Sequence, residues 1–555
     1  MLSVAPVAAV LAAVSLALAA AGTGWAAVAT WSLSAVILAE EAAGSRRALG
    51  AGFGREVPAR LLLLTAATVG AVRHSPDDRG WIWAIAAVLL VGVVLEPLPL
   101  RAVRRVRAVH ALPGYRPPPG AAAVPLFVWA SFVELLAAGA LGVAKAPLVL
   151  RFALLGVAVA IDAVIVTIAA LTWRDRTAAR RRLRRALEEY APQFVLYNGR
   201  EDGGAYQLAM WLPYLERLGL PFVVVVRGQA ALEAVTSVTS APIVSPISLR
   251  DLDDVVVGSI RAAFYPSSAA NNAHLVAYRS VRHVYLGHGD SDKAMSPHPM
   301  HAMYDHVFVA GQAAIDRYRR NGVHIRPSAY MVIGRPQLEV IHVAHGPVPA
   351  RPTVLYAPTW AGHNTAGTHS SLPQGQNLVR ALLQQDVVIL FRPHPISRRI
   401  PAERARAAAI DELLRQDSAR TGRIHRFGPA VDGTSFADSA NVCDMMLADM
   451  SSIMVDFLGS QKPMAVNVRG VETSEEFLAH YPAARGAYLV AADGANLAEV
   501  ISAMRGDDPQ RTARQATAEY YLGGLDGAGA VTAFLDAAGQ CIRGERTPER
   551  AGPPS

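Results

Sequence analysis

Hydrophobic and polar positions divide the chain near residue 173. Before this point apolar residues form long uninterrupted runs, and after it they alternate with polar residues as in a water-soluble α/β protein. A helix needs about 20 apolar residues to cross a bilayer. The pattern therefore predicts a membrane domain of about six transmembrane helices over residues 1–173. The six runs lie at 3–22, 24–40, 59–73, 81–99, 121–143 and 147–172.

Lysine and arginine are distributed unevenly between these runs. Segments 41–60 and 100–120 and the stretch after 172 are rich in arginine, whereas the alternate connections carry few basic residues. Basic loops stay in the cytoplasm, so we expect a multi-pass protein of the bacterial cell membrane with both termini and the C-terminal half cytoplasmic. A cleaved signal peptide is the alternative for run 3–22, but this run lacks a basic start and its removal would break the alternation.

Three charged residues lie within the predicted spans, namely Glu134, Asp162 and Arg151. Buried charges in a membrane are costly and usually face a partner. A functional role and a purely structural Glu134–Arg151 pair are both open.

The rest of the chain predicts an α/β fold. Residues 174–191 are strongly basic and have helical spacing, so we expect a juxtamembrane connector helix. Short β-branched runs such as "FVVVV" (222–226) and "HVFVA" (306–310) then alternate with helical segments, a pattern typical of parallel sheets covered by helices on both faces.

A stretch rich in proline and glycine, "HGPVPARPT" at 345–353, divides this half into two doubly wound, Rossmann-like domains. We expect an N-terminal domain at 192–345, a C-terminal domain at 346–545, and a disordered tail at 546–555. Two such domains with a cleft between them resemble the GT-B fold of glycosyl- and phosphotransferases, and this resemblance implies that the second domain is the nucleotide-donor side and the first the acceptor side. The predicted fold class is thus an α-helical membrane domain followed by a GT-B fold.

Composition narrows the classes of partner. Hydrophobic residues make up 52% of the chain and charged residues 18%, which suggests a membrane part. The net charge of +8 comes largely from basic runs that directly follow apolar spans, so we expect contact with membrane lipids and no nucleic acid. Cys443 and Cys541 are the two cysteines and imply no disulfide framework. No cofactor and no metal are expected.

The stretch "LFRPHP" (390–395) places Arg392 and His394 where a buried strand must stop. Proline cannot donate to a sheet ladder, and it pushes the preceding residue toward an extended backbone. Ligands of open α/β sheets bind at the carboxyl ends of strands, and the guanidinium of arginine suits a phosphate. A polar turn without further function is the alternative.

Two further strand ends carry groups that suit a phosphate. "DMSSIMVDF" places Asp449, Ser451 and Ser452 between a strand and a helix, where a serine can cap the helix and N–H groups bind anions. Thr359 ends "VLYAPT" and offers a hydroxyl. These residues are candidates for binding the pyrophosphate of a donor.

The stretch "LGHGDSDK" (286–293) in the first domain contains His288 between two glycines. A histidine can deprotonate an acceptor hydroxyl at neutral pH. Gly289, Asp290 and Lys293 are candidates for the acceptor side. Neither "DLDD" (251–254) nor "HPMH" (298–301) forms a convincing metal site.

The ordered motifs "LGHG", "VIGRP", "VLYAPTW", "LFRPHP", "ADMSSIMVDFL" and "KPMAVNV" resemble those of the CDP-glycerol glycerophosphotransferase family, the teichoic acid polymerases and primases. The resemblance covers roughly 193–470. It implies that His288 is the catalytic base and that His394 contacts the donor phosphates. The family usually has Trp before the His-Gly pair and Thr after it, whereas this chain has Gly287 and Asp290.

The resemblance implies a membrane-anchored transferase that moves glycerol phosphate, or a related polyol phosphate, from a CDP-activated donor to a lipid-linked or glycan acceptor in synthesis of a cell-wall polymer. One alternative is a GT-B glycosyltransferase that uses a nucleotide sugar. Another is a non-catalytic export or sensing protein with a nucleotide-binding module.

Overall fold

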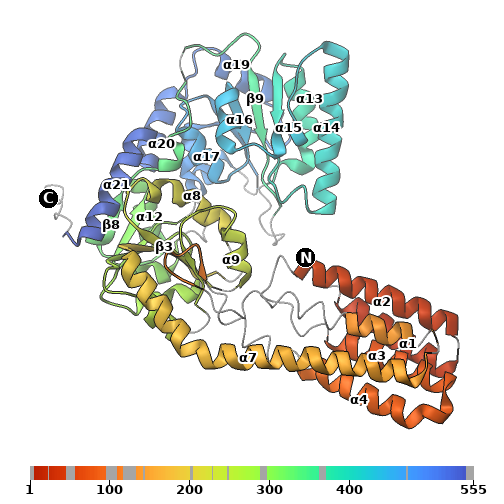
Figure 1. Ribbon diagram of the computed structural model, residues 1–555. Coiled ribbons are helices and arrows are strands. Elements are labelled where there is room, and N and C mark those ends of the chain that lie inside the picture. Colours follow the sequence, from red (N-terminus) through yellow and green to blue (C-terminus); the bar gives the residue numbers. More distant parts are fainter. Residues whose placement is uncertain are drawn as a thin grey trace. The chain divides into compact units, whose positions relative to one another are not determined.

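The fold is that of a computed structural model of the 555-residue chain (Figure 1). The structure describes residues 5–22, 24–45, 57–95, 109–116, 133–141, 144, 146–200, 204–227, 229–246, 249–287, 297–344, 346–361, 370–469 and 473–545. They divide into two compact units. One comprises 1–209, 220–263 and 269–281, and the other comprises 210–219, 264–268 and 282–555.

Four α-helices form most of the described residues of the first unit up to residue 95. Polar side chains join its helices through backbone carbonyls, since Ser34 Oγ donates to Ala8 O at 2.8 Å and Trp31 Nε1 donates to Leu63 O at 3.0 Å. These bonds satisfy polar groups inside an apolar bundle. The helices are α1 (Ala5–Ala21), α2 (Gly24–Ser45), α3 (Val57–His74) and α4 (Arg79–Leu95).

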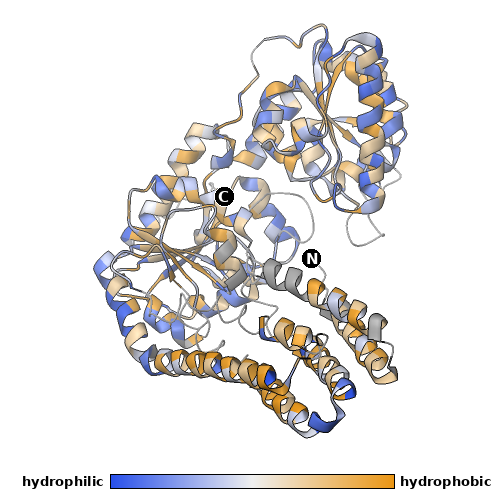
Figure 2. Cartoon of the chain, turned by 45° about the vertical axis from the view of Figure 1, so that its right-hand side comes forward, coloured by the Kyte–Doolittle hydropathy of each residue, from blue (hydrophilic) through white to orange (hydrophobic). Residues whose placement is uncertain are grey.

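Two helical segments in the described part of the chain are long and apolar enough to cross a membrane, Pro76–Leu95 and Leu148–Asp175. Helices α1 and α2 contribute shorter apolar stretches, Ala8–Ala21 and Ala26–Ile37. Apolar residues nevertheless cover much of these helices (Figure 2). The predicted number of six spans is therefore not supported, since two segments of the described residues meet the length and hydropathy of a span, and most of the predicted fifth span at 121–143 lies outside these residues.

Helix α7 (Leu148–Tyr190) joins the predicted last span and the predicted basic connector into one helix of 43 residues (Figure 1). It ends at Ala191, which has a left-handed φ of 50°. Its basic part is held by the "DLDD" segment: Arg184 Nη1 donates to Asp253 O at 3.0 Å, and Arg180 pairs with Asp254.

The charged residues of the predicted spans have specific neighbours. Arg151 donates to Ala146 O and Leu141 O, each at 3.2 Å. Asp162 on α7 lies so close to Gly92 on α4 that a Cβ at Gly92 would come within 2.7 Å of its carboxylate.

The first sheet has the strand order β1-β4-β3-β2-β5-β6-β7-β8, and the boundary between the two units falls within β5. Segment 100–120, predicted as a cytoplasmic loop, supplies β1, which pairs antiparallel with β4. The strands are β1 (Val109–His110), β2 (Phe194–Asn198), β3 (Phe222–Val226), β4 (Ile243–Val244), β5 (Ala262–Tyr265), β6 (Arg282–Tyr285), β7 (His306–Val309) and β8 (Tyr330–Val332). The accompanying helices are α8 (Ala205–Glu216), α9 (Gln229–Val235), α10 (Leu249–Val255), α11 (Ala273–Val276) and α12 (Gln312–Arg320).

The second sheet is parallel and has the order β10-β9-β11-β12-β13. Alternate residues of β9 enter opposite cores: Leu355 packs with α17 and α20, whereas Tyr356 packs with α13, α14 and α19. Helices on both faces confirm the predicted doubly wound α/β class. The strands are β9 (Thr353–Ala357), β10 (Val388–Phe391), β11 (Met445–Ala448), β12 (Met464–Asn467) and β13 (Tyr488–Val490). The helices are α13 (Gly375–Leu383), α14 (Pro401–Thr421), α15 (Pro429–Asp432), α16 (Phe436–Val442), α17 (Ser452–Leu458), α18 (Ser474–His480), α19 (Leu497–Arg505), α20 (Arg511–Leu522) and α21 (Gly527–Arg543).

The last helix, α21, packs against residues of the first α/β region although its sequence was predicted as part of the second domain. The ring of Phe534 lies 5.2 Å from that of Trp211 and 6.1 Å from that of Phe308, measured between centroids. Short 3₁₀ turns connect many elements, including η4 (Pro299–Met303), η6 (Pro336–Leu338) and η7 (Leu372–Gln374).

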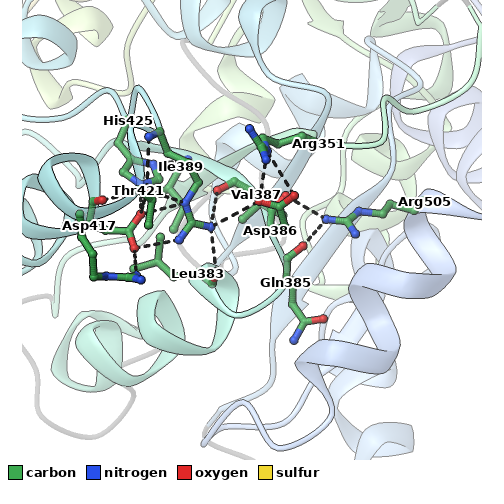
Figure 3. Close-up of polar contacts among 12 residues, drawn as sticks. Arg351, Leu383, Gln385, Asp386, Val387, Ile389, Asp417, Thr421, His425 and Arg505 are labelled. Carbon is green, nitrogen blue, oxygen red and sulfur yellow. Dashed lines mark hydrogen bonds and ion pairs between the residues drawn. The ribbon is translucent and has the colours of Figure 1, made fainter.

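A buried polar cluster anchors the start of β10 (Figure 3). The His425 ring accepts the Ile389 N–H through Nδ1 at 2.9 Å and bonds Asp417 through Nε2 at 3.0 Å. Arg423 donates to the same carboxylate through Nε and Nη2, both at 2.8 Å. Arg423 also donates to Leu383 O at 2.9 Å. This cluster lies at the end of β10 opposite to "RPHP".

Candidate functional site

The carboxyl ends of three neighbouring strands bring the predicted donor residues to one edge of the second sheet. Thr359 follows β9, Arg392 follows β10, and Asp449 follows β11, and β9 lies between the other two strands. In a parallel sheet these ends share one edge, which is where ligands bind. Strand order thus places these three strand ends next to one another in the second sheet.

Asp449 is fully buried and links two loops. Its Oδ2 accepts the backbone N–H groups of Thr359 and Ser371, each at 2.8 Å. Its Oδ1 has no hydrogen-bond partner among the described residues. Burial raises the pKa of the Asp449 carboxyl to about 6, against the opposing effect of the N–H donors and of Arg469. Asp449 therefore shapes the edge of the sheet and carries a carboxyl that titrates near neutrality.

The loop that begins at Thr359 is held from two sides. Asp449 accepts the N–H of Thr359, and Glu403, in the first turn of α14, accepts the N–H of Ala361 at 3.0 Å. Ser370 Oγ donates to Thr359 O at 2.7 Å. The backbone on which the Thr359 hydroxyl stands is consequently fixed.

Arg392 uses its guanidinium within the protein. Nη2 donates to Thr434 O at 2.9 Å, and Nη1 reaches Val431 O and Thr434 Oγ1, both at 3.2 Å. Burial lowers the pKa of the guanidinium, against the attraction of Asp432 and Asp438. Arg392 thus holds the segment between α15 and α16 beside the edge of the sheet, a role that the sequence did not suggest.

His394 is half-buried in the turn that the two prolines create. Its backbone N–H donates to Pro358 O at 3.1 Å, and its Nδ1 accepts the N–H of Ile396 at 3.2 Å. A neutral ring that accepts at Nδ1 carries its proton on Nε2. The ring centroid lies 6.2 Å from that of Trp360. His394 and the segment after Thr359 therefore lie together at this edge.

Ser451 occupies the N-cap position of α17, but the predicted capping bond is wrong. The side chain makes no hydrogen bond to the helix N-terminus, and the buried Oγ has no partner in the described part of the chain. The backbone φ of −158° keeps Ser451 extended, and the helix that starts at Ser452 has only 7 residues. The Ser451 hydroxyl therefore does not cap α17, which is a short helix.

A protein-family model matches a segment of the chain that contains the second sheet. Residues 339–522 match the family model described as CDP-Glycerol:Poly(glycerophosphate) glycerophosphotransferase. The match contains Thr359, Arg392, His394, Asp449 and Ser451. The motifs "LGHG" and "VIGRP" precede the matched residues, so the wider resemblance predicted for 193–470 is supported over its second part.

Solved structures that match this chain include a wall teichoic acid polymerase and a UDP-N-acetylglucosamine 2-epimerase. The wall teichoic acid polymerase TagF has 13% identity, with 68% of this chain and 96% of that chain covered and a TM-score of 0.41. A complex of S. aureus MnaA with UDP has 14% identity, with 64% and 99% covered and a TM-score of 0.43. A UDP-N-acetylglucosamine 2-epimerase has 12% identity, with 65% and 98% covered and a TM-score of 0.43. No curated protein matches the sequence.

Two residues in the glycerophosphotransferase match were missed by the sequence reading. Arg469 follows β12, and its Nε donates to Asn467 Oδ1 at 2.6 Å while Nη2 donates to Ala492 O at 2.7 Å. Glu403 has a buried Oε2 without a partner among the residues described. Arg469 could have been found because it follows a strand as Arg392 does, whereas nothing in the helical sequence around Glu403 marks it.

The predicted acceptor-side residues His288, Gly289, Asp290 and Lys293 lie outside the described residues. The structure describes the strand that leads to them. Trp211 Nε1 donates to Gly287 O at 2.7 Å, and Gly287 has a left-handed φ of 68°, which favours glycine. The backbone immediately before His288 is therefore held in a defined turn.

Proposed function

We propose that this protein transfers glycerol phosphate, or a related polyol phosphate, from a CDP-activated donor to an acceptor hydroxyl. The observation that carries the proposal is the family match over 339–522, which contains the strand ends where Thr359, His394 and Asp449 meet. The protein would then be a transferase for substituted phosphate groups. The proposed acceptor is a lipid-linked glycan in the synthesis of a teichoic-acid-like polymer.

In the proposed reaction the acceptor oxygen attacks the β-phosphorus of the donor. A new P–O bond forms, the bond from that phosphorus to the bridging oxygen breaks, and CMP leaves with the electron pair. His288 would take the proton of the attacking hydroxyl. His394 would stabilise charge on the pyrophosphate through Nε2, because Nδ1 is already an acceptor within its turn.

Asp449 and Arg392 contribute in this proposal by shaping the edge rather than by touching the donor. Asp449 fixes the backbone of Thr359 and Ser371, and Arg392 fixes the segment that contains Thr434. A rigid surround keeps catalytic groups in productive geometry.

A transfer assay with the full-length chain tests the function. We expect CDP-glycerol to yield CMP and an acceptor extended by glycerol phosphate, with little turnover of UDP-glucose or UDP-N-acetylglucosamine. Transfer from a UDP-sugar in place of CDP-glycerol would favour the glycosyltransferase alternative. Tight binding of CDP without turnover on any acceptor would favour the non-catalytic alternative.

We also propose that the C-terminal half and the loop at 100–120 face the cytoplasm. The pairing of β1 with β4 supports this proposal, because it places Val109–His110 on the same side as the α/β sheet. A cysteine introduced at Arg104 should react with a membrane-impermeant reagent only after the cells are opened. Labelling in intact cells would contradict the topology.

A further inference from the structure

A groove lies at the amino-terminal edge of the second sheet, opposite to the edge assigned to the donor. Arg351, just before β9, and Asp386, just before β10, both line this groove. The last turns of α13 and α14 complete its wall. Its volume is about 730 Å³, and small-molecule sites typically have about 300–1,000 Å³. The groove is therefore large enough for a ligand of its own.

Positive charge exceeds negative charge in this groove. The charged residues that line it are four arginines, Arg351, Arg380, Arg420 and Arg423, and two aspartates, Asp386 and Asp417. Arg505 lies beside the groove and adds to the positive charge, since it donates to Asp386 O at 3.3 Å (Figure 3). The C-terminal ends of α13 and α14 each carry about half a negative charge, so an excess of about two positive charges remains. The groove thus suits a dianion.

Two of the four arginines are committed to carboxylates. Arg423 is buried and donates to Asp417 through both Nε and Nη2. Arg351 Nε lies 3.1 Å from Oδ1 and 3.2 Å from Oδ2 of Asp386. Arg423 Nη1 also donates to Leu383 O at 2.9 Å, which ties the residues after α14 to the end of α13. The last turns of the two helices therefore meet at the groove.

Arg380 and Arg420, which lie in these last turns, keep donors for a ligand. Arg380 is exposed, and its Nη1 donates to the neutral amide of Asn377 at 3.0 Å. The side chain of Arg420 is 71% exposed, and Nη2 is its one donor to Asp417 among the described residues. Since that carboxylate also accepts two bonds from Arg423, it would keep partners if Arg420 turned toward a ligand.

The charge and the apolar part of the wall restrict the ligand. A phosphate monoester carries a charge of about −1.5 to −2 near pH 7, and its oxygens suit the forked donors of guanidinium groups. A phosphodiester, with a single negative charge, would leave part of the excess unmatched. Leu383 and Leu413 are half-buried in the wall, so an organic group attached to the phosphate can pack on them.

We infer that this groove binds a small organic phosphate monoester, with Arg380 and Arg420 donating to the phosphate and the organic group packed on Leu383 and Leu413. The inference does not depend on the proposed function, because the groove lies at the edge of the sheet opposite to Thr359, His394 and Asp449. The chain would thus have a second phosphate site, separate from that of the donor.

Isothermal titration of the full-length chain with phenyl phosphate tests the groove, with excess CDP present so that the donor edge is already filled. Arg380→Gln and Arg420→Gln should each weaken phenyl phosphate binding about fivefold, as expected for the loss of an exposed ion pair, and the double variant should bind more weakly than either. Arg406→Gln removes an exposed arginine of α14 that does not line the groove and should change nothing. Equal binding by wild type and the double variant would overturn the inference.

Two further probes separate the sources of the phosphate. Inorganic phosphate should bind more weakly than phenyl phosphate, because it cannot pack on the leucines, and equal affinity would overturn the assignment of the organic group. Dihexanoyl phosphatidylglycerol, a soluble phosphodiester, should not displace phenyl phosphate, and displacement would reassign the groove to a lipid headgroup.

Thermal unfolding without ligand guards against a folding defect. Arg380→Gln should melt like the wild type, since Arg380 contacts neither Asp386 nor Asp417, so its effect on binding alone decides the case if Arg420→Gln is unstable. A chain that binds phenyl phosphate in the groove but never uses CDP-glycerol would refute the proposed function alone. A chain that uses CDP-glycerol while Arg380→Gln binds phenyl phosphate as the wild type does would refute the groove alone.

Discussion

Arg335 and Asp456 form an ion pair that joins two sequence motifs, with Nε of Arg335 2.6 Å from Oδ1 of Asp456. Arg335 belongs to "VIGRP" after β8, and Asp456 lies on α17 in "SSIMVDF". The two side chains are 9% and 18% exposed. Removal of one partner from a buried pair leaves the other charge uncompensated, so we expect Asp456→Ala to lower the free energy of unfolding by about 3–5 kcal/mol.

Denaturant unfolding of Asp456→Ala beside Glu412→Ala measures this effect. Glu412 pairs with Arg415 on the surface, where the two side chains are 53% and 61% exposed. Exposed pairs contribute about 0–1 kcal/mol, so Glu412→Ala should be nearly neutral. Similar effects in the two variants would show that the Arg335–Asp456 pair does not stabilise the fold.

Asp449 should make stability depend on pH in an unusual direction. Its pKa in the folded protein is about 6, above its usual value of 3.8, so the folded state binds more protons than the unfolded state between these values. The contribution of Asp449 to stability is therefore present at low pH and is lost as the pH rises toward 6. Asp449→Asn should remove this dependence.

The difference in melting temperature between Asp449→Asn and wild type, measured from pH 4 to pH 7.5, reports on Asp449 alone. We expect the variant to gain relative stability as the pH rises. A difference that is constant with pH would show that the carboxyl does not titrate in this range. Donor affinity measured in parallel should fall in the variant if ionised Asp449 is needed to hold Thr359 and Ser371.

His394 and Arg392 should differ when each is replaced by alanine. His394→Ala should weaken CDP-glycerol binding by one to two orders of magnitude, since hydrogen bonds to charged groups contribute about 1.5–3 kcal/mol, with little change in melting temperature. Arg392→Ala, in contrast, should lower the melting temperature, because the carbonyls of Val431 and Thr434 lose the hydrogen bonds that Arg392 donates. Isothermal titration and thermal unfolding of both variants test the distinction. Full affinity for CDP-glycerol in His394→Ala would remove His394 from the donor site.

His288→Ala should reduce kcat by about 10²–10⁴-fold, as expected for the loss of a general base. Donor affinity should stay close to that of the wild type, because His288 is assigned to the acceptor side. Initial rates at saturating CDP-glycerol measure the effect. A variant with wild-type turnover, or one that fails only through lower thermal stability, would exclude His288 as the base.

The Asp417–His425 cluster should make the second sheet sensitive to acid. Although burial opposes ionisation of Asp417, hydrogen bonds from Arg423, His425 and Thr421 hold its pKa below its usual range. Burial lowers the pKa of His425, against the attraction of Asp417. Each group therefore stabilises the fold at neutral pH, and this contribution is lost as the pH falls. The contribution of His425 is lost first, below about pH 6.5, which is the ordinary pKa of histidine.

His425→Gln should reduce this acid sensitivity and lower the melting temperature at pH 7.5, since the glutamine cannot bridge Ile389 N–H and Asp417 with the same geometry. His480→Gln is a suitable control, because His480 is exposed on α18. If the difference in melting temperature between His425→Gln and His480→Gln stays constant from pH 7.5 to pH 5, His425 does not cause the acid sensitivity.

Local patterns in the sequence determined the class of the fold. Buried β-branched runs predicted strands such as β3 and β7, and the prolines of "LFRPHP" predicted the stop of β10 after Phe391, because both signals act within a few residues. The same rule placed Thr359, Arg392 and Asp449 at strand ends. Parallel pairing then brings such ends to one edge whatever the details of packing.

Tertiary structure decided what these side chains do there. Asp449 accepts N–H groups of Thr359 and Ser371, and Arg392 donates to Thr434 O. It also decided that segment 100–120 supplies an edge strand and that α21 packs on Trp211. Each of these contacts joins residues distant in the chain, and burial and hydrogen bonding across such distances depend on how the elements pack, which no local pattern encodes.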